Sequence, residues 1–269
     1  MTEFAKAAGT QIAYDTSGEG PDLVFLHAGI ADRTMWRPQL EALSDRFRCT
    51  AFDARGFGGS ALGDQPFSRR DDLAAVLDAL GASSASLIGC SIGAGFALDF
   101  AIERPERVEA LVLSGVVPAG FDYHDPVDEA VYEEVDKAIA AGDYDKAAAL
   151  EVGLWVDGPR RDEGAAPDWL RDMVHGWCVR IAQISEWGES AQLDPKAASR
   201  LNEVTAPTLV IVGKDDLDGI LEGCRATAEG IAGGRLVELE GTAHLPSLEV
   251  MNEFNKVLVE FLEGSIHRD

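Results

Sequence analysis

Short apolar runs recur along this chain and alternate with longer stretches of helical periodicity. A run such as Leu23–Leu26 is apolar throughout, as expected for a strand that is covered on both faces. Residues 3–16 alternate weakly instead and predict an antiparallel hairpin at the edge of a sheet. The runs that predict buried strands are Leu23–Leu26, Arg48–Asp53, Ser86–Gly89, Glu109–Ser114, Thr208–Val212 and Leu236–Leu239. Their alternation with helices predicts an α/β fold with a largely parallel sheet.

Helical patterns fill the intervals between these runs. Arg70–Leu80 is followed by Gly81, which is a typical residue at a helix C-terminus. Ser91–Glu103 carries apolar residues around most of its circumference and should end before Pro105. Val250–Leu262 predicts a closing amphipathic helix.

The segment 118–200 breaks this alternation, because it contains helical patterns but no convincing strand. The patterns cover Val127–Ala140 and Trp169–Ile184. We therefore divide the chain into an α/β core, residues 1–117 and 201–269, and an inserted helical cap, residues 118–200. Most of the tryptophans lie in this cap, and we expect Trp155 and Trp177 to wall a substrate pocket.

Acidic residues dominate the charge of the chain, which has 47 Asp and Glu against 23 Lys and Arg, a net charge of -24. Phosphate groups are bound by clustered cations, so we expect binding neither to nucleic acid nor to a membrane. No apolar run is long enough for a spanning helix, and the N-terminus does not resemble a secretory signal. The four cysteines show no paired spacing, which favours a reduced, cytoplasmic protein. The sequence does not indicate an oligomeric state.

One short motif carries the strongest chemical prediction. Gly89-Cys90-Ser91-Ile92-Gly93 follows a predicted strand and opens a predicted helix. This strand–turn–helix setting is that of a nucleophile elbow, in which flanking glycines let a tight turn expose the serine hydroxyl. Ser91 would then lie at a helix N-terminus, where backbone N–H groups favour developing negative charge. The motif predicts a nucleophilic serine at position 91.

A serine nucleophile needs a base, and the base needs a carboxylate to orient it. His244 lies in a loop between the last predicted strand and the last helix, at an edge where α/β sheets place their sites. Gly213-Lys214-Asp215-Asp216 follows another strand and offers carboxylates at the same edge. Strand alternation lets only one of Asp215 and Asp216 reach His244 easily, and Asp218 lies further into the loop. The chain order is nucleophile, acid, then base.

Two backbone N–H groups must also point at the oxygen that becomes negative during acyl transfer. Ile92, directly after the nucleophile, should supply one. Gly29, just after the first core strand in His27-Ala28-Gly29, should supply the other. His27 lies beside a glycine at the end of an early strand, so we expect it to brace this loop and not to act as the base.

Taken together, these motifs resemble the α/β-hydrolase superfamily over nearly the whole chain. The matching segments are His27-Ala28-Gly29, Asp53-Ala54-Arg55-Gly56-Phe57-Gly58-Gly59-Ser60, the elbow, Gly213–Asp216 and Gly241–Glu249. The resemblance implies an eight-stranded, mostly parallel sheet with helices on both faces and an inserted helical cap. It is greatest to the capped esterase, enol-lactonase and C–C hydrolase branch. The family's spacing from Gly213 implies Asp216 as the acid.

Two departures from the family pattern bear on the site. Ala28 stands where the family usually has a glycine, which should reshape the oxyanion loop slightly. A proline that commonly follows the acid loop is missing from Leu217–Leu221, so the path of the chain beyond Asp216 is less constrained.

The sequence thus predicts a hydrolase that cleaves a small carboxylic ester or lactone through an acyl-enzyme, with Ser91, His244 and Asp216 as a triad. We expect neither a cofactor nor a metal ion, because no zinc-type ligand spacing and no nucleotide-binding motif occurs. C–C bond hydrolysis and perhydrolysis by the same triad are alternatives. A non-catalytic ligand receptor on the same fold is a further one. Related enzymes with an aspartate nucleophile are disfavoured by Ser91.

Overall fold

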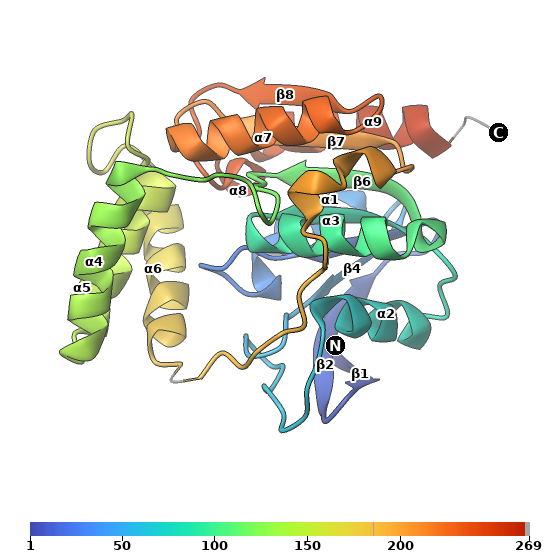
Figure 1. Cartoon of the computed structure of the whole chain (residues 1–269), viewed down its shortest axis with the longest axis horizontal. Coiled ribbons are helices and arrows are strands. Elements are labelled where there is room, and N and C mark those ends of the chain that lie inside the picture. The colour runs from blue at the N-terminus through green and yellow to red at the C-terminus, as the bar shows by residue number, and fades with distance from the viewer. Residues whose placement is uncertain (185, 267–269) are drawn as a thin grey trace.

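The computed structural model describes residues 1–184 and 186–266, and its centre is one twisted sheet (Figure 1). The sheet has eight strands in the order β1-β2-β4-β3-β5-β6-β7-β8. The two pairings that involve β2 are antiparallel and all others are parallel. The strands are β1 Glu3–Ala7, β2 Thr10–Ser17, β3 Asp22–Leu26, β4 Arg48–Phe52, β5 Ala85–Cys90, β6 Val108–Ser114, β7 Thr208–Gly213 and β8 Arg235–Leu239. The predicted mostly parallel, eight-stranded sheet is confirmed.

Helices cover both faces of this sheet. In Figure 1, α2, α3 and α7 lie on the nearer face, and α1 and α9 lie on the other. The helices of the core are α1 Arg37–Leu43, α2 Arg69–Ala79, α3 Ile92–Glu103, α7 Asp218–Gly230, α8 Pro246–Glu249 and α9 Met251–Ile266. Single 3₁₀ turns occur at η1 Arg33–Trp36, η2 Pro105–Arg107, η4 Ala197–Ser199 and η5 Leu201–Glu203. Among the described helices, none is long and apolar enough to cross a membrane.

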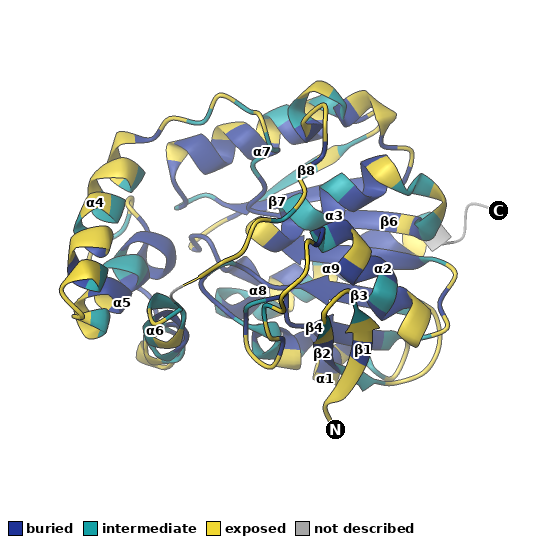
Figure 2. Cartoon of the chain, turned by 60° about the horizontal axis from the view of Figure 1, so that its bottom comes forward, coloured by how far each residue is buried: buried dark blue, intermediate teal, exposed yellow. Residues whose placement is uncertain are grey.

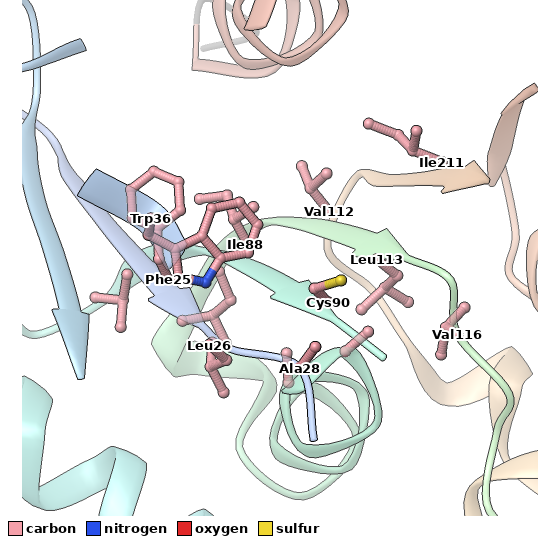
Figure 3. Packing of buried hydrophobic residues seen from close by; sticks show 14 of the residues in the cluster. Phe25, Leu26, Ala28, Trp36, Ile88, Cys90, Val112, Leu113, Val116 and Ile211 are labelled. Carbon is pink, nitrogen blue, oxygen red and sulfur yellow. The ribbon is translucent and has the colours of Figure 1, made fainter. Parts of the chain in front are cut away.

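The core is built from strands whose side chains are buried on both faces. Phe25 on β3 lies beside Ile88 on β5, which lies beside Val112 on β6 (Figure 3). Trp36 covers this row, with its ring 5.2 Å from that of Phe25. Such burial on both faces explains why these strands are apolar at most positions and do not alternate.

The strand order reverses direction at β3, which has β4 on one side and β5 on the other. In open parallel sheets, sites form at such a switch point, beyond the carboxyl ends of the strands. The loops that follow β3 and β5 therefore meet where a ligand can approach both. They contain Gly29 and Ser91, respectively.

A group of helices between β6 and β7 stands beside the carboxyl edge of the sheet (Figures 1 and 2). It consists of α4 Pro126–Ala140, α5 Tyr144–Val152, the π-helical turn η3 Gly153–Asp157 and α6 Asp168–Ala182. We call α4, η3, α5 and α6 the cap helices. The division of the chain at residues 118 and 200 stays a prediction.

Hydrogen bonds at two points of the segment, after η3 and at the start of α4, hold the cap helices to the core. Arg161, just beyond η3, donates to Glu249 at 2.6 Å and to the carbonyl oxygen of Gly241 at 3.0 Å. At the start of α4, Asp125 caps the helix and also accepts from the backbone of Gly219 at 3.3 Å. These contacts place the cap helices directly over the loops that follow the strands.

One buried ion pair fixes the connection between β4 and α2. Arg55 is fully buried, and its Nε and Nη2 donate to the two carboxylate oxygens of Asp72 at 3.0 and 2.5 Å. Its Nη1 donates to the carbonyl oxygen of Ala8 at 2.7 Å, which ties the edge hairpin to the same point. A buried charge is tolerated only when it is paired and hydrogen-bonded in this way.

We therefore predict that Asp72→Ala lowers the free energy of unfolding by about 3–5 kcal/mol, because it leaves the Arg55 guanidinium buried without a counter-charge. Urea denaturation followed by circular dichroism measures the change. Asp78 on the same helix provides the control, since its side chain is 69% exposed and pairs with Arg107. Asp78→Ala should cost less than about 1 kcal/mol. Equal losses in the two variants would contradict the role of the buried pair.

Candidate active site

Ser91 occupies a strained turn between β5 and α3. Its backbone has φ 54° and ψ −120°, and it is the one non-glycine residue with positive φ in the part of the chain that the structure describes. Such a conformation costs about 1–3 kcal/mol and persists only where the surroundings impose it. The backbone N–H of Ser91 donates to the carbonyl oxygen of Ser114 on β6 at 2.8 Å. For this reason α3 begins at Ile92, one residue later than the sequence pattern predicts.

The two glycines of the motif make the turn possible by close approach. A side chain at position 89 would place its Cβ 2.5 Å from the Cα of Ala94. At position 93, a Cβ would lie 2.5 Å from the carbonyl oxygens of Leu26 and His27. Both distances are too short for any Cβ, so α3 can pack this close to β3 and β5 only with glycine at both positions.

His244 and Asp216 meet in a buried contact. The Nδ1 atom of His244 lies 2.7 Å from Oδ2 of Asp216, and both side chains are almost fully buried. The other carboxylate oxygen of Asp216 accepts from the backbone N–H of Leu217 at 2.9 Å. A carboxylate can only accept at this position, so Nδ1 of His244 carries the hydrogen and Nε2 is left with its lone pair.

The three aspartates near this loop have different environments. Asp216 contacts His244, whereas the carboxylate of Asp215 lies 3.9 Å from Arg161. Asp218 is 78% exposed on its side chain and pairs with Arg160. The alternation of side chains along the end of β7 accounts for the difference between Asp215 and Asp216. Geometry thus favours Asp216 over both alternatives as the partner of His244.

Ser91 and His244 line the same cavity, although no hydrogen bond between them occurs among the described residues. Nε2 of His244 is buried and has no hydrogen-bond partner in that part of the chain. The Trp155 ring lies 4.4 Å from the imidazole, and the backbone N–H of His244 donates to the carbonyl oxygen of Trp155 at 3.2 Å. A buried, unpartnered nitrogen that faces a cavity is a polar group left for a ligand or a reacting proton.

The two predicted oxyanion donors lie next to each other. A Cβ on Gly29 would lie 3.5 Å from the side chain of Ile92, which places the β3 loop against the first residue of α3. The N–H of Ile92 is at the first position of a helix, so it has no partner within that helix. Neither N–H has a backbone acceptor outside the helices among residues 1–184 and 186–266. Both groups are available to an oxygen in the cavity.

His27 braces the loop, in agreement with the sequence-based expectation. Its Nε2 accepts from the backbone N–H of Ala54 at 2.9 Å, and its Nδ1 lies 2.8 Å from the carbonyl oxygen of Ala28. Burial lowers the pKa of His27, which keeps the ring neutral with the hydrogen on Nδ1. Ala28, where the family pattern has glycine, is fully buried and its N–H lies 3.4 Å from the sulfur of Met35.

The cavity above Ser91 has a volume of about 690 Å³ and is walled largely by apolar and aromatic side chains. Trp155 lines it, as the sequence predicts. Trp177 does not: it is 4% exposed and lines a separate cavity of about 210 Å³. The prediction that Trp177 walls the substrate pocket is therefore wrong, because its side of α6 packs into the core. Trp187 lines the main cavity instead, with its ring 5.0 Å from that of Phe57.

Within the described residues, no group of three or more His, Cys, Asp or Glu side chains is arranged to hold a metal ion. The site therefore consists of a serine, an imidazole, a carboxylate and two free N–H groups around one cavity. A protein-family model described as alpha/beta hydrolase fold matches residues 21–249. The chain belongs to this family.

Relatives of this hydrolase with curated names have diverse activities. The chain is 27% identical over 274 residues to 2-hydroxy-6-oxo-6-phenylhexa-2,4-dienoate hydrolase of Comamonas testosteroni, covering 93% of this chain and 91% of the relative. It is 27% identical over 279 residues to carboxylesterase YbfK of Bacillus subtilis, covering 98% and 87%. The enol-lactonase of Burkholderia xenovorans LB400 is a solved structure of the same fold, with a TM-score of 0.73, 23% identity, and coverage of 97% of this chain and 100% of that one.

The thiol beside the candidate nucleophile allows a test of the site's burial. All four cysteines are buried, and Cys90 directly precedes Ser91. Burial, followed by the nearby charge of Asp216, raises the pKa of Cys90 to about 12. At pH 8 only about one part in 10⁴ of this thiol would be thiolate, the reactive form.

We predict that iodoacetamide at pH 8 leaves Cys90 of the native protein unmodified, as measured by mass spectrometry of its peptide. The same treatment in urea should modify all four cysteines and serves as the control. Rapid labelling of Cys90 in the native protein would show that the turn is more open than described.

Proposed function

We propose that this hydrolase cleaves small carboxylic esters or lactones through an acyl-enzyme on Ser91. The observation that carries the proposal is the state of His244. Its Nδ1 is bound to Asp216 at 2.7 Å, its Nε2 has no hydrogen-bond partner in the described structure, and the residue lines the same cavity as Ser91. This is the arrangement in which an imidazole accepts a serine proton.

In the first half of the reaction, Nε2 of His244 takes the hydroxyl proton of Ser91 as Oγ attacks the carbonyl carbon. The carbonyl oxygen becomes negative and accepts hydrogen bonds from the N–H groups of Gly29 and Ile92. Asp216 stabilises the imidazolium and keeps it in the correct tautomer. His244 then returns the proton to the leaving alcohol oxygen, the carbon–oxygen bond breaks, and the acyl group stays on Ser91.

In the second half, a water molecule gives a proton to His244 as its oxygen attacks the acyl carbon. The same two N–H groups again receive the negative oxygen. The bond between the acyl carbon and Oγ breaks, His244 returns the proton to Oγ, and a carboxylic acid is released. In a lactone the alcohol and the acid are parts of one molecule, so the product is a hydroxy acid.

Cleavage of a carbon–carbon bond by the same three residues is the second candidate. It is favoured by the likeness to a relative that is named as the hydrolase of an oxo-dienoate. An ester is the first choice because the likeness to a named carboxylesterase covers more of this chain. A screen of p-nitrophenyl esters of increasing length, lactones and diketones decides between them by the highest kcat/KM. A receptor without activity would turn over none of these compounds.

We predict that Ser91→Ala abolishes covalent labelling by a fluorophosphonate and lowers kcat for p-nitrophenyl acetate by about 10⁴-fold or more. The reagent forms a bond to the activated serine, so labelling reports the nucleophile directly. Mass spectrometry locates the label on the wild type. Ser114→Ala is the control variant. Ser114 is buried on β6, so this variant should still be labelled on Ser91. Unchanged labelling of Ser91→Ala would remove this serine as the nucleophile.

We also predict that Asp216→Asn lowers kcat by about 10⁴-fold, the loss produced by the same change in serine proteases. An asparagine amide donates to Nδ1 and so favours the tautomer whose Nε2 cannot take a proton. Asp218→Asn is the matched control, since Asp218 is exposed, and its rate should stay near that of the wild type. Collapse of activity in Asp218→Asn with a normal rate in Asp216→Asn would reverse the assignment.

A further inference from the structure

The cavity above Ser91 contains an arginine that the proposed reaction does not use. Arg69 is the first residue of α2 and is the one Arg or Lys among the described residues that line this cavity. Its Nη1 donates to the carbonyl oxygen of Arg55 at 2.5 Å. The guanidinium carbon lies 5.1 Å from the centre of the Phe67 ring and 5.3 Å from that of Phe96. The group is thus clamped between aromatic rings with one hydrogen bond.

No carboxylate pairs with Arg69 in the described parts of the chain, although acidic residues outnumber basic ones about twofold. The nearest candidate on α2, Asp72, is already bound through both oxygens to Arg55. A half-buried cation without a counter-charge is unfavourable, and burial lowers the pKa of Arg69 accordingly. A guanidinium presents its donors in a planar fork that matches a carboxylate in two parallel hydrogen bonds. The remaining donors of Arg69 therefore suit an anion that enters the cavity.

We propose that Arg69 binds a carboxylate of the substrate, so that the ester or lactone cleaved here carries a second, ionised carboxyl group. This inference rests on the proposed function of Ser91, whose site the anion would share. A small monoacid ester would leave Arg69 unpaired, whereas an ester of a dicarboxylic acid would supply its missing counter-charge. Arg69 is a specificity-determining residue and takes no part in bond cleavage.

Arg69 lies at the same end of the sheet as Ser91, so one substrate can reach both. Helix α2 follows β4 and runs back along the sheet, so its first residue lies at the same edge as Ser91. Phe96, which contacts the guanidinium, lies five residues beyond Ser91 on α3, about 7.5 Å further along the helix axis.

Two acidic side chains also line the cavity, and they come from the cap helices. Asp128 on α4 accepts from the hydroxyl of Tyr123 at 2.8 Å, and Glu151 lies on α5. Burial raises the pKa of both groups, which disfavours their charged forms and weakens their repulsion of an anion. Arg69 lines the cavity from the core, on α2, together with Phe57, while Phe67 and Phe96 contact its guanidinium. The part of the cavity lined by Arg69 is therefore the part that selects for charge.

Matched substrates test this selection. The probes are the monomethyl esters of succinic, glutaric, adipic and pimelic acid, and the methyl esters of the corresponding monoamides. The two members of each pair have the same number of heavy atoms, and at pH 7.5 only the first is charged. Release of methanol gives kcat/KM for each. We expect the wild type to favour the charged member of at least one pair by about tenfold or more, as a charge-assisted pair of hydrogen bonds allows.

Arg69→Gln should lower this charged-to-neutral ratio at least about tenfold, and Arg69→Lys should restore part of it, because lysine keeps the charge but not the planar fork. Arg104 supplies the control. Its guanidinium also lies over a phenylalanine ring, 5.7 Å from the centre of Phe100, but it pairs with Asp71 and is not among the residues that line the cavity. Arg104→Gln should keep the wild-type ratio. Thermal unfolding checks that every variant is folded.

Calorimetric binding of the glutarate dianion gives a readout that does not depend on catalysis. We expect Ser91→Ala to bind glutarate more tightly than the neutral diamide, and Ser91→Ala/Arg69→Gln to lose that difference. A wild-type ratio near one for all four pairs overturns the proposal, as does an equal ratio in the wild type and Arg69→Gln. If glutarate binds through Arg69 but no ester is hydrolysed, the proposed function has failed and the carboxylate site stands.

Discussion

The turn between β5 and α3 constrains almost everything else at this site. Ser91 is held at φ 54° because its N–H is bound to β6 and because α3 packs against two strands at glycine-only distances. This close packing brings the first N–H of α3 beside the loop after β3. The oxyanion donors are thus arranged by the same contacts that strain the serine. The strain is local, whereas the packing that maintains it extends over the central strands of the sheet.

Much of the fold could be predicted from the sequence because buried parallel strands and tight turns restrict residue types locally. All six apolar runs are strands, with bounds that differ by one residue or less. Helix α7 was not predicted, because Gly219 and Gly223 weaken its helical pattern. The structure explains both: a Cβ on Gly219 would lie 2.5 Å from the Tyr123 ring, and one on Gly223 would lie 2.8 Å from Val117. Glycine was needed for tertiary packing, which a local pattern does not record.

In the candidate site, too, residues marked by a local motif could be predicted, whereas residues placed by tertiary packing could not. Ser91 and His244 are marked by local motifs, whereas the choice of Asp216 needed the direction of each side chain at the end of β7. Arg69 was missed because it precedes a second arginine, Arg70, and the sequence does not say which of the two lines the cavity. In the structure Arg69 lines the cavity, whereas Arg70 is buried elsewhere and pairs with Glu103 at the end of α3, 3.0 Å away. Trp177 was wrongly placed in the pocket for a similar reason, since the orientation of α6 depends on packing.

The backbone bond between His244 and Trp155 joins two parts of the molecule that could otherwise move separately. Trp155 belongs to η3 among the cap helices, and its ring and carbonyl oxygen both contact the base. A displacement of η3 away from the sheet would stretch this bond and change the surroundings of the imidazole at the same time. The position of the cap helices and the positioning of the base are therefore coupled through a single residue, Trp155.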